Sequence, residues 1–155
     1  YSGIIYRFSD PLHAMLHDLG IPNTRDNLAM LSQSLRKNFG ESIMGRWVRE
    51  FIEKHEGKLI ILEGIRRVES LWEFNEFVDA IIWIDTPPDI RYERIKTRWE
   101  KSGEWILTRE DFDKDDQLET ELSLEKFQKI ANIVVENSST KESLYDKLSL
   151  ILKNS

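Results

Sequence analysis

Apolar side chains gather in four short runs, separated by longer stretches in which they recur every three or four positions. The runs cover residues 4–8, 59–62, 80–84 and 133–135. Three of these runs are continuous rather than alternating, which is typical of strands covered on both faces in a parallel sheet. Because parallel strands need long crossovers that helices normally supply, the pattern predicts an α/β fold.

The stretches between the runs carry clear helix boundaries. Asp10, followed by a proline, marks a helix start, and Gly20 marks its end. Thr24 is expected to cap a second helix, which Gly40 terminates. Further helices are expected at residues 41–55, 69–76, 88–101, 108–117 and 123–130, and from residue 140 onward.

The order of these elements predicts a single domain over residues 1–155. A chain of 155 residues has the size of one ordinary domain, and 40% apolar residues are enough to form a core. Several helices fall between the third and fourth expected strands. A helical excursion, about residues 88–126, is therefore expected at that point.

Composition excludes several kinds of chemistry. The chain has no cysteine, which rules out a disulfide scaffold, a thiol nucleophile and a cysteine zinc site. No apolar run approaches the roughly 20 residues that cross a bilayer, and no signal peptide is visible, so we expect a cytoplasmic protein without a membrane partner. The net charge of −6 is opposite to what charge-based nucleic-acid binding requires, so no nucleic-acid partner is expected.

The negative charge is concentrated in one segment. Residues 110–126 hold eight acidic and two basic side chains, a net charge of −6, so the rest of the chain sums to zero. Directly before this segment, residues 91–109 hold six basic and three acidic side chains. We expect the acidic segment to be mostly a solvated helix face, some of whose carboxylates neutralise the preceding arginines when no ligand is bound.

No metal site is predicted. His13 and His17 lie four residues apart, but no third ligand accompanies them, so structural or surface roles are expected. The spacing of the acidic residues does not match a calcium loop.

Charged side chains follow two of the expected strands. Glu63, Arg66 and Arg67 come directly after the second apolar run, and Asp10 comes directly after the first. In open parallel sheets ligands bind outside the carboxyl ends of the strands, and arginine suits phosphate or carboxylate groups. The residues therefore indicate an anion-binding site, although a solvated turn and a simple helix cap would give the same pattern.

A basic helix face follows the third expected strand. Arg91, Arg94 and Arg98 are spaced by three and four residues, which places all three on one side of a helix. Such a face can clamp a phosphate group, and it can equally be solvated surface.

Four short segments together resemble the P-loop nucleoside monophosphate kinase group, most closely its dephospho-coenzyme-A-kinase-like and phage-type deoxynucleoside monophosphate kinase members. The segments are residues 8–10, 62–67, 87–94 and 111–116. In that order, they look like the end of the group's second strand, the end of its third strand, the start of its lid helix and the acidic segment in which the lid leads back to the sheet. Glu63 stands where Asp is commoner, and Arg67 stands where a smaller residue often follows.

The resemblance implies a P-loop kinase-like three-layer fold with a helical lid insertion. The phosphate loop of this group, G-x-x-x-x-G-K-[ST], is absent from the sequence, because no pair of glycines has the required spacing. The one Gly-Lys pair, Gly57-Lys58, has Ile52 at the position of the first glycine. In that fold the strand before the phosphate loop is central. With this strand missing and Tyr1 in place of Met, about 20 further residues are expected upstream, the usual size of a strand–loop–helix start.

The activity implied by the resemblance is transfer of the γ-phosphoryl group of ATP, with Mg²⁺, to a small phosphate-bearing acceptor such as a nucleoside monophosphate or dephospho-coenzyme A. Arg91, Arg94 and Arg98 would clamp the transferring group, and Asp10 would orient or deprotonate the acceptor. Arg36, Arg66 and Arg67 would hold the acceptor's anionic group. Glu63 would support the magnesium through water. The alternatives are a catalytically inactive binding or scaffolding module and an assembly factor acting on a protein or RNA; the oligomeric state stays open.

Overall fold

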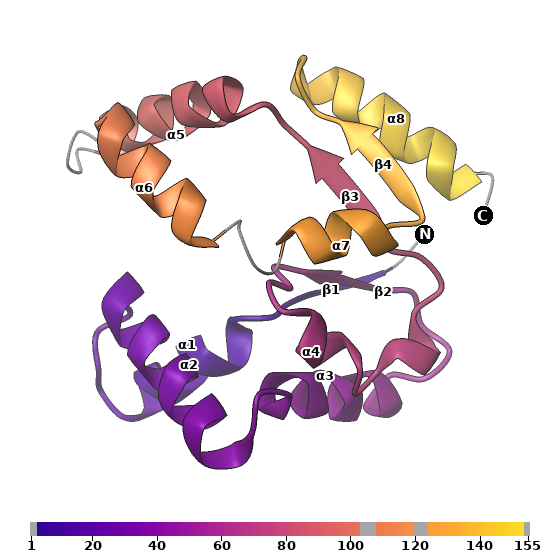
Figure 1. Cartoon of the computed structure of the whole chain (residues 1–155). Helices are drawn as coiled ribbons and strands as arrows, with labels where there is room; N and C mark the ends of the chain where they lie inside the picture. The colour runs from indigo at the N-terminus through magenta and orange to yellow at the C-terminus, as the bar shows by residue number, and fades with distance from the viewer. Residues whose placement is uncertain (1–2, 103–107, 120–123, 154–155) are drawn as a thin grey trace. The chain divides into compact units, whose positions relative to one another are not determined.

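The computed structural model describes residues 3–102, 108–119 and 124–153 (Figure 1). The chain forms two compact units, Tyr1–Val78 and Asp79–Ser155, and each contains one pair of parallel strands. Helices alternate with these strands, which confirms the predicted α/β class. Residues 103–107 and 120–123 of the predicted helical excursion lie outside the described residues.

The first unit is built on strands β1 (Ile4–Arg7) and β2 (Ile60–Glu63). They are parallel, and the register runs from Ile4 opposite Ile60 to Arg7 opposite Glu63. The crossover between them contains three helices, and β2 leads into a short helix and a 3₁₀ turn. These elements are α1 (Asp10–Asp18), α2 (Arg25–Phe39), α3 (Ile43–Lys54), α4 (Val68–Leu71) and η1 (Asn75–Phe77).

Local signals explain the helix boundaries in this unit. The Thr24 hydroxyl accepts a hydrogen bond from the backbone N–H of Asn27 at 3.2 Å and so caps α2. Gly40 ends the same helix with φ = +98°, a conformation that favours glycine. Both boundaries confirm the prediction. The predicted helix at residues 69–76 is instead divided into α4 and η1.

The core of the first unit lies between α1, α3 and the segment after β2. Its side chains are less than a tenth exposed and include Leu12, Leu16, Met44, Val48, Leu71 and Phe74. Gly45 of α3 lies against α4 so closely that a Cβ atom at this position would be 2.1 Å from the Ser70 carbonyl oxygen. Only glycine allows this approach, which fixes the position of α4 and of Arg67, the residue before it.

The β1–β2 pair is covered on one face rather than two. Tyr6 stacks on Phe51 of α3 with ring centroids 4.0 Å apart, whereas Ile5 is 66% exposed and Ile61 is 45% exposed. Figure 1 shows the helices of this unit on one side of the two strands. The expectation of burial on both faces is therefore wrong within this unit, because residue burial alternates along each strand.

The second unit is built on strands β3 (Ile82–Asp85) and β4 (Ile133–Glu136). They are parallel, with Ile82 opposite Ile133, and α8 packs against β4 (Figure 1). The described residues between the two strands include three helices, in agreement with the predicted helical excursion. The helices of this unit are α5 (Pro88–Ser102), α6 (Arg109–Glu119), α7 (Glu125–Ile130) and α8 (Lys141–Lys153).

Among the described residues of the second unit, buried apolar side chains come from α6, α7 and β4. Phe112 of α6, Phe127 of α7 and Val135 of β4 are each at most 6% exposed. The Thr108 hydroxyl accepts from the backbone N–H of Asp111 at 3.1 Å, which caps α6. No helix in the described part of the chain is long and apolar enough to cross a membrane.

Candidate functional site

Two carboxylates lie at the carboxyl edge of the β1–β2 pair. The strand register sets Arg7 opposite Glu63, and the Arg7 Nε donates to the Glu63 Oε1 at 2.5 Å. The Asp10 Oδ2 accepts from the backbone N–H of Arg7 at 3.2 Å. The structure thus brings Asp10 and Glu63 to one edge through Arg7, a residue to which the sequence reasoning gave no role.

The position of Asp10 also affects the neighbouring strand. Burial, and to a smaller extent the Asp10 charge, raise the pKa of the Tyr6 phenol. The negative charge of Asp10 therefore acts on the strand pair. Asp10 is the first residue of α1 and Ser9 is in the cap position, with no side-chain cap hydrogen bond, so the prediction that Asp10 caps this helix is wrong; its carboxylate binds the Arg7 N–H instead.

Two of the predicted acceptor-binding arginines meet at a shared carboxylate. Arg36 lies in the last turn of α2, Arg67 immediately precedes α4, and Glu41 lies between α2 and α3. The Glu41 Oε2 is 3.2 Å from the Arg67 Nη1 and 3.8 Å from the Arg36 Nε. We call Arg36 and Arg67, with Glu41 between them, the arginine pair. Arg66, next to Arg67, is exposed.

The arginine pair has more positive than negative charge. The Arg36 side chain is 19% exposed, and its Nη1 donates to the Ser32 hydroxyl at 2.6 Å, which orients the guanidinium. Burial and the Arg67 charge lower the pKa of Arg36, although Glu41 acts in the opposite direction. Two guanidinium groups against one carboxylate leave a local charge of +1, so this geometry can bind a further anion.

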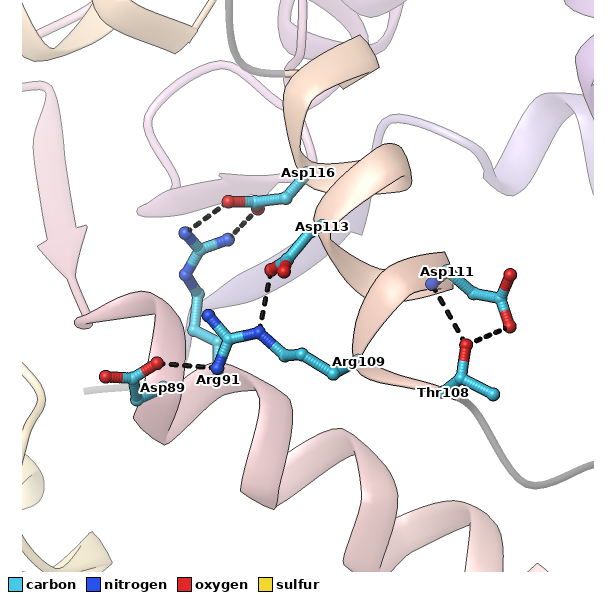
Figure 2. Close-up of polar contacts among 7 residues, drawn as sticks. All are labelled: Asp89, Arg91, Thr108, Arg109, Asp111, Asp113 and Asp116. Carbon is cyan, nitrogen blue, oxygen red and sulfur yellow. Dashed lines mark hydrogen bonds and ion pairs between the residues drawn. The ribbon is translucent and has the colours of Figure 1, made fainter.

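In the second unit Arg91 is fixed between α5 and α6 (Figure 2). Its two Nη atoms donate to the two carboxylate oxygens of Asp116, with 2.9 Å between Nη2 and Oδ2. Its Nε donates to the carbonyl oxygen of Thr86 at 3.0 Å. Each nitrogen of this guanidinium therefore already binds a protein group.

Arg109 makes a second connection between the same two helices (Figure 2). It donates through Nη1 to Asp89 at 2.6 Å and through Nε to Asp113 at 2.8 Å. The Asp89 hydrogen bond, then the Asp113 hydrogen bond, raise the pKa of this arginine. Its guanidinium also lies over the Tyr92 and Phe112 rings, at 5.4 and 5.8 Å from their centroids. We call these two arginines and their carboxylates, Asp89, Asp113 and Asp116, the α5–α6 clasp.

The clasp confirms that acidic side chains of the 110–126 segment neutralise the arginine segment. Asp113 and Asp116 come from the acidic segment, and Asp89 adds a third carboxylate from the first turn of α5. The sequence predicts that carboxylates of the acidic segment neutralise the preceding arginines. It does not predict that Arg91 binds Asp116, because this contact depends on how α6 packs on α5.

Arg94 and Arg98 differ from Arg91 although all three lie on one helix. Arg94 donates from Nη1 to the Asn137 carbonyl at 2.8 Å and from Nη2 to the Ser139 carbonyl at 2.7 Å, which holds the loop after β4. Arg98 is exposed and makes no polar contact with another described residue. An open groove of about 470 Å³ runs along α5; it is lined by Asp89, Ile90, Glu93, Arg94 and Thr97.

Among the described residues, no group of three or more His, Cys, Asp or Glu side chains could hold a metal ion. The two histidines considered in the sequence have local partners, since the His13 ring is 2.9 Å from the Asn23 Oδ1 and the His17 ring is 3.2 Å from the Asp18 Oδ1. A role for Glu63 in supporting magnesium through water stays a prediction.

The two units thus define an α/β protein with an arginine pair that shares one carboxylate and a separate clasp of arginines and aspartates. No family model matches the chain. It is similar to the UPF0200/UPF0201 protein of Archaeoglobus fulgidus, with 27% identity over 140 residues, which is 86% of this chain and 42% of that protein. It is also 29% identical over 129 residues to the UPF0200 protein of Sulfurisphaera tokodaii, covering 83% of this chain and 71% of the relative.

A third relative, the UPF0200 protein of Thermococcus onnurineus, is 26% identical over 133 residues, covering 79% of this chain and 69% of its own length. The chain therefore spans less than half of the Archaeoglobus protein and about two thirds of the other two. These names state no activity, substrate or partner.

Proposed function

We propose that this chain belongs to a P-loop kinase-like phosphotransferase that moves the γ-phosphoryl group of ATP to a small phosphate-bearing acceptor, such as a nucleoside monophosphate or dephospho-coenzyme A. The observation that carries the proposal is the arginine pair, in which Arg67, four residues after the end of β2, shares Glu41 with Arg36 of α2. Open parallel sheets bind ligands at this edge, and arginine is the side chain best matched to phosphate.

The arginine pair would hold the acceptor's phosphate, and Asp10 would orient the acceptor group that receives the phosphoryl. Phosphoryl transfer depends on positioning and charge neutralisation more than on covalent chemistry, so preoriented cations and one carboxylate suffice on the acceptor side. ATP-bound Mg²⁺ would neutralise charge on the donor phosphates. Arg36 is already oriented by Ser32, which reduces the ordering cost of binding.

Of the three arginines on α5, Arg98 is the one that we assign to the transferring phosphoryl group, because its side chain is exposed. Arg91 and Arg94 already donate to Asp116 and to the loop after β4, whereas Arg98 is exposed. Arg91 and Arg94 would therefore maintain the shape of the lid, and Arg98 would supply the positive charge that contacts the phosphoryl group.

The grouping of the strands supports the kinase-like fold. β1 pairs with β2 in one unit and β3 pairs with β4 in the other, and both pairs are parallel, as in the sheet of this fold. The three helices α5, α6 and α7 lie between β3 and β4, as a lid insertion requires. The donor-phosphate loop G-x-x-x-x-G-K-[ST] does not occur in these 155 residues, so the test uses the protein encoded by the complete gene.

The test measures ADP release by that protein with Mg-ATP and a panel of nucleoside monophosphates, deoxynucleoside monophosphates and dephospho-coenzyme A. We expect turnover with one acceptor class and a fall in kcat of roughly 100-fold in Arg98→Ala, the scale for loss of one preorganised charge donor. Lys96→Ala removes a neighbouring cation on α5 and is the matched control. Acceptor-independent ATP hydrolysis alone, or an unchanged Arg98→Ala, would contradict the proposal. Binding of ATP and acceptor without turnover would favour the non-catalytic binding module.

A further inference from the structure

Ser32 of α2 lies against the less exposed arginine of the arginine pair. Its hydroxyl oxygen accepts a hydrogen bond from the Arg36 Nη1 at 2.6 Å, and the two residues are one helical turn apart. We propose that Ser32 is a third anion-binding group of this site, which accepts from Arg36 and donates its own proton to the phosphate group that Arg36 binds. The inference rests on the proposed function for the identity of the anion, and it assigns a ligand contact to a residue outside the predicted site.

The contact with Arg36 determines what the Ser32 hydroxyl has left to offer. A guanidinium carries only donors, so the Ser32 oxygen is the acceptor in this contact and uses one of its lone pairs. A serine hydroxyl also has one proton that it can donate. This proton takes no part in the contact with Arg36 and therefore needs an acceptor elsewhere.

Ser32 does not use the acceptor that is usual for such a proton. In a helix the hydroxyl of serine or threonine often donates to the carbonyl oxygen four residues earlier. Thr97 of α5 does so, with 2.9 Å between its Oγ1 and the Glu93 carbonyl oxygen. Ser32 makes no such hydrogen bond to Leu28, and no other described residue accepts its proton. The proton is therefore available to a ligand.

The Arg36 guanidinium determines where this ligand would bind. Its Nη1 donates to Ser32, whereas its Nε is 3.8 Å from the Glu41 carboxylate, which is beyond hydrogen-bond distance. The guanidinium thus makes no second hydrogen bond with the described residues, and its other N–H groups are available to an anion. All nitrogens of a guanidinium are bonded to one carbon, so a phosphate oxygen that accepts from them comes close to the Ser32 hydroxyl.

A phosphate monoester has enough acceptors for all three groups. It carries three strong acceptor oxygens, which matches the number of side chains that would donate to it, Arg36, Arg67 and Ser32. Hydrogen bonds to a charged group contribute more than those between neutral groups. Ser32 would therefore raise the affinity directly, in addition to orienting Arg36.

The inference can be tested by calorimetric titration of the protein encoded by the complete gene with phenyl phosphate. Ser32→Ala removes the hydroxyl and suits a helix, and we expect it to bind phenyl phosphate about 10-fold more weakly. Ser32→Cys leaves only a weak donor and should also bind more weakly, which keeps the test valid if Ser32→Ala is poorly folded. Ser32→Thr keeps the hydroxyl and should retain the wild-type affinity. Glu41 is present in every variant, so its competition with the ligand cancels in these comparisons.

Ser34→Ala is the matched control. Ser34 is an exposed serine on the same helix, and its hydroxyl makes no hydrogen bond with a described residue. This variant should bind phenyl phosphate as tightly as the wild type does.

A crystal structure of the same protein with phenyl phosphate separates donation by Ser32 from orientation of Arg36. We expect the Ser32 Oγ to lie about 2.5–3.0 Å from a phosphate oxygen while it still accepts from Arg36. If the phosphate binds the arginines and the Ser32 hydroxyl contacts Arg36 alone, the hydroxyl only orients the arginine and the inference is overturned. Binding at another place, equal affinities of the wild type and Ser32→Ala, or no binding by the wild type overturns it as well.

The inference and the proposed function fail separately. If Ser32→Ala weakens the binding of phenyl phosphate and no acceptor supports ATP turnover, only the phosphotransferase proposal falls. If turnover occurs and Ser32→Ala changes neither the affinity for phenyl phosphate nor the KM for the acceptor, only the role of Ser32 falls.

Discussion

The arginine pair and the α5–α6 clasp are built from the same kinds of side chain in different proportions. In the arginine pair two guanidinium groups share the single carboxylate of Glu41, at 3.2 and 3.8 Å. In the clasp, Arg91 and Arg109 face three carboxylates, and the closest contact of Arg109 is 2.6 Å. The clasp also lies over aromatic rings, including the buried Phe112.

This difference separates arginines that hold the fold from arginines that can hold a ligand. An arginine surrounded by excess carboxylate joins secondary-structure elements and has no charge left for a substrate. An arginine that is oriented but incompletely neutralised retains attraction for an anion. Spacing along a helix does not distinguish the two cases, because Arg91, Arg94 and Arg98 share one face of α5 and have three different environments.

The largest effect is expected from Gly45→Ala, which would disturb the frame of the arginine pair. The new methyl group would lie 2.1 Å from the Ser70 carbonyl oxygen, a backbone atom that cannot turn away, so α3 and α4 would have to separate. We expect the free energy of unfolding to fall by about 3 kcal/mol, at the upper end for overpacking a core. Denaturant titration measures this change.

Gly3→Ala is the control for Gly45→Ala, because its new methyl group would meet Leu59 at an ordinary 3.4 Å. The control should change the free energy of unfolding by less than about 0.5 kcal/mol. If Gly45→Ala unfolds at the same denaturant concentration as the wild type, the close approach of α3 and α4 does not define the position of Arg67.

Replacing Arg91 and Arg67 separately by alanine tests whether the clasp stabilises the fold more than the arginine pair does. Arg91→Ala leaves the Asp116 carboxylate, which is 22% exposed, without its partner, so we expect a loss of about 1 kcal/mol and faster hydrogen exchange in α6. Arg67→Ala leaves Glu41 with Arg36, and both Arg67 and Glu41 are about half-exposed, so its cost should stay below about 0.5 kcal/mol. Equal destabilisation by the two substitutions would remove the distinction between clasp and binding site.

The elements that local chemistry determines could be predicted from the sequence. The four apolar runs lie within two residues of the observed strands, and Thr24 and Gly40 bound α2 as expected. Both results follow from short-range causes: β-branched runs favour strands, a hydroxyl caps a helix start, and glycine adopts positive φ.

The partners of the charged side chains could not be predicted in the same way. Glu41 and Arg67 are 26 residues apart, Arg91 and Asp116 are 25 apart, and Arg94 reaches a carbonyl 45 residues later. These contacts depend on how helices pack, and many carboxylates are equally available in the sequence. The exposure of Ile5 and Ile61 escaped prediction for a related reason, since an apolar run does not reveal which of its two faces is covered.

The smallest effect concerns Tyr6, whose phenol reports the negative charge of Asp10 at the carboxyl edge of the β1–β2 pair. Burial and then Asp10 raise the pKa of Tyr6 above the ordinary value of 10.0, so its neutral form is favoured in the folded state. The resulting stabilisation is present below pH 10 and is lost as the pH rises through the higher folded-state pKa. In an ultraviolet titration, with Tyr6→Phe identifying the signal, Asp10→Asn should lower this pKa but leave it above the ordinary value, because burial is the larger cause. Asp18→Asn, at the far end of α1, should not move it. If Asp10→Asn leaves the pKa of Tyr6 unchanged, burial alone raises this pKa and the charge of Asp10 does not act on the phenol.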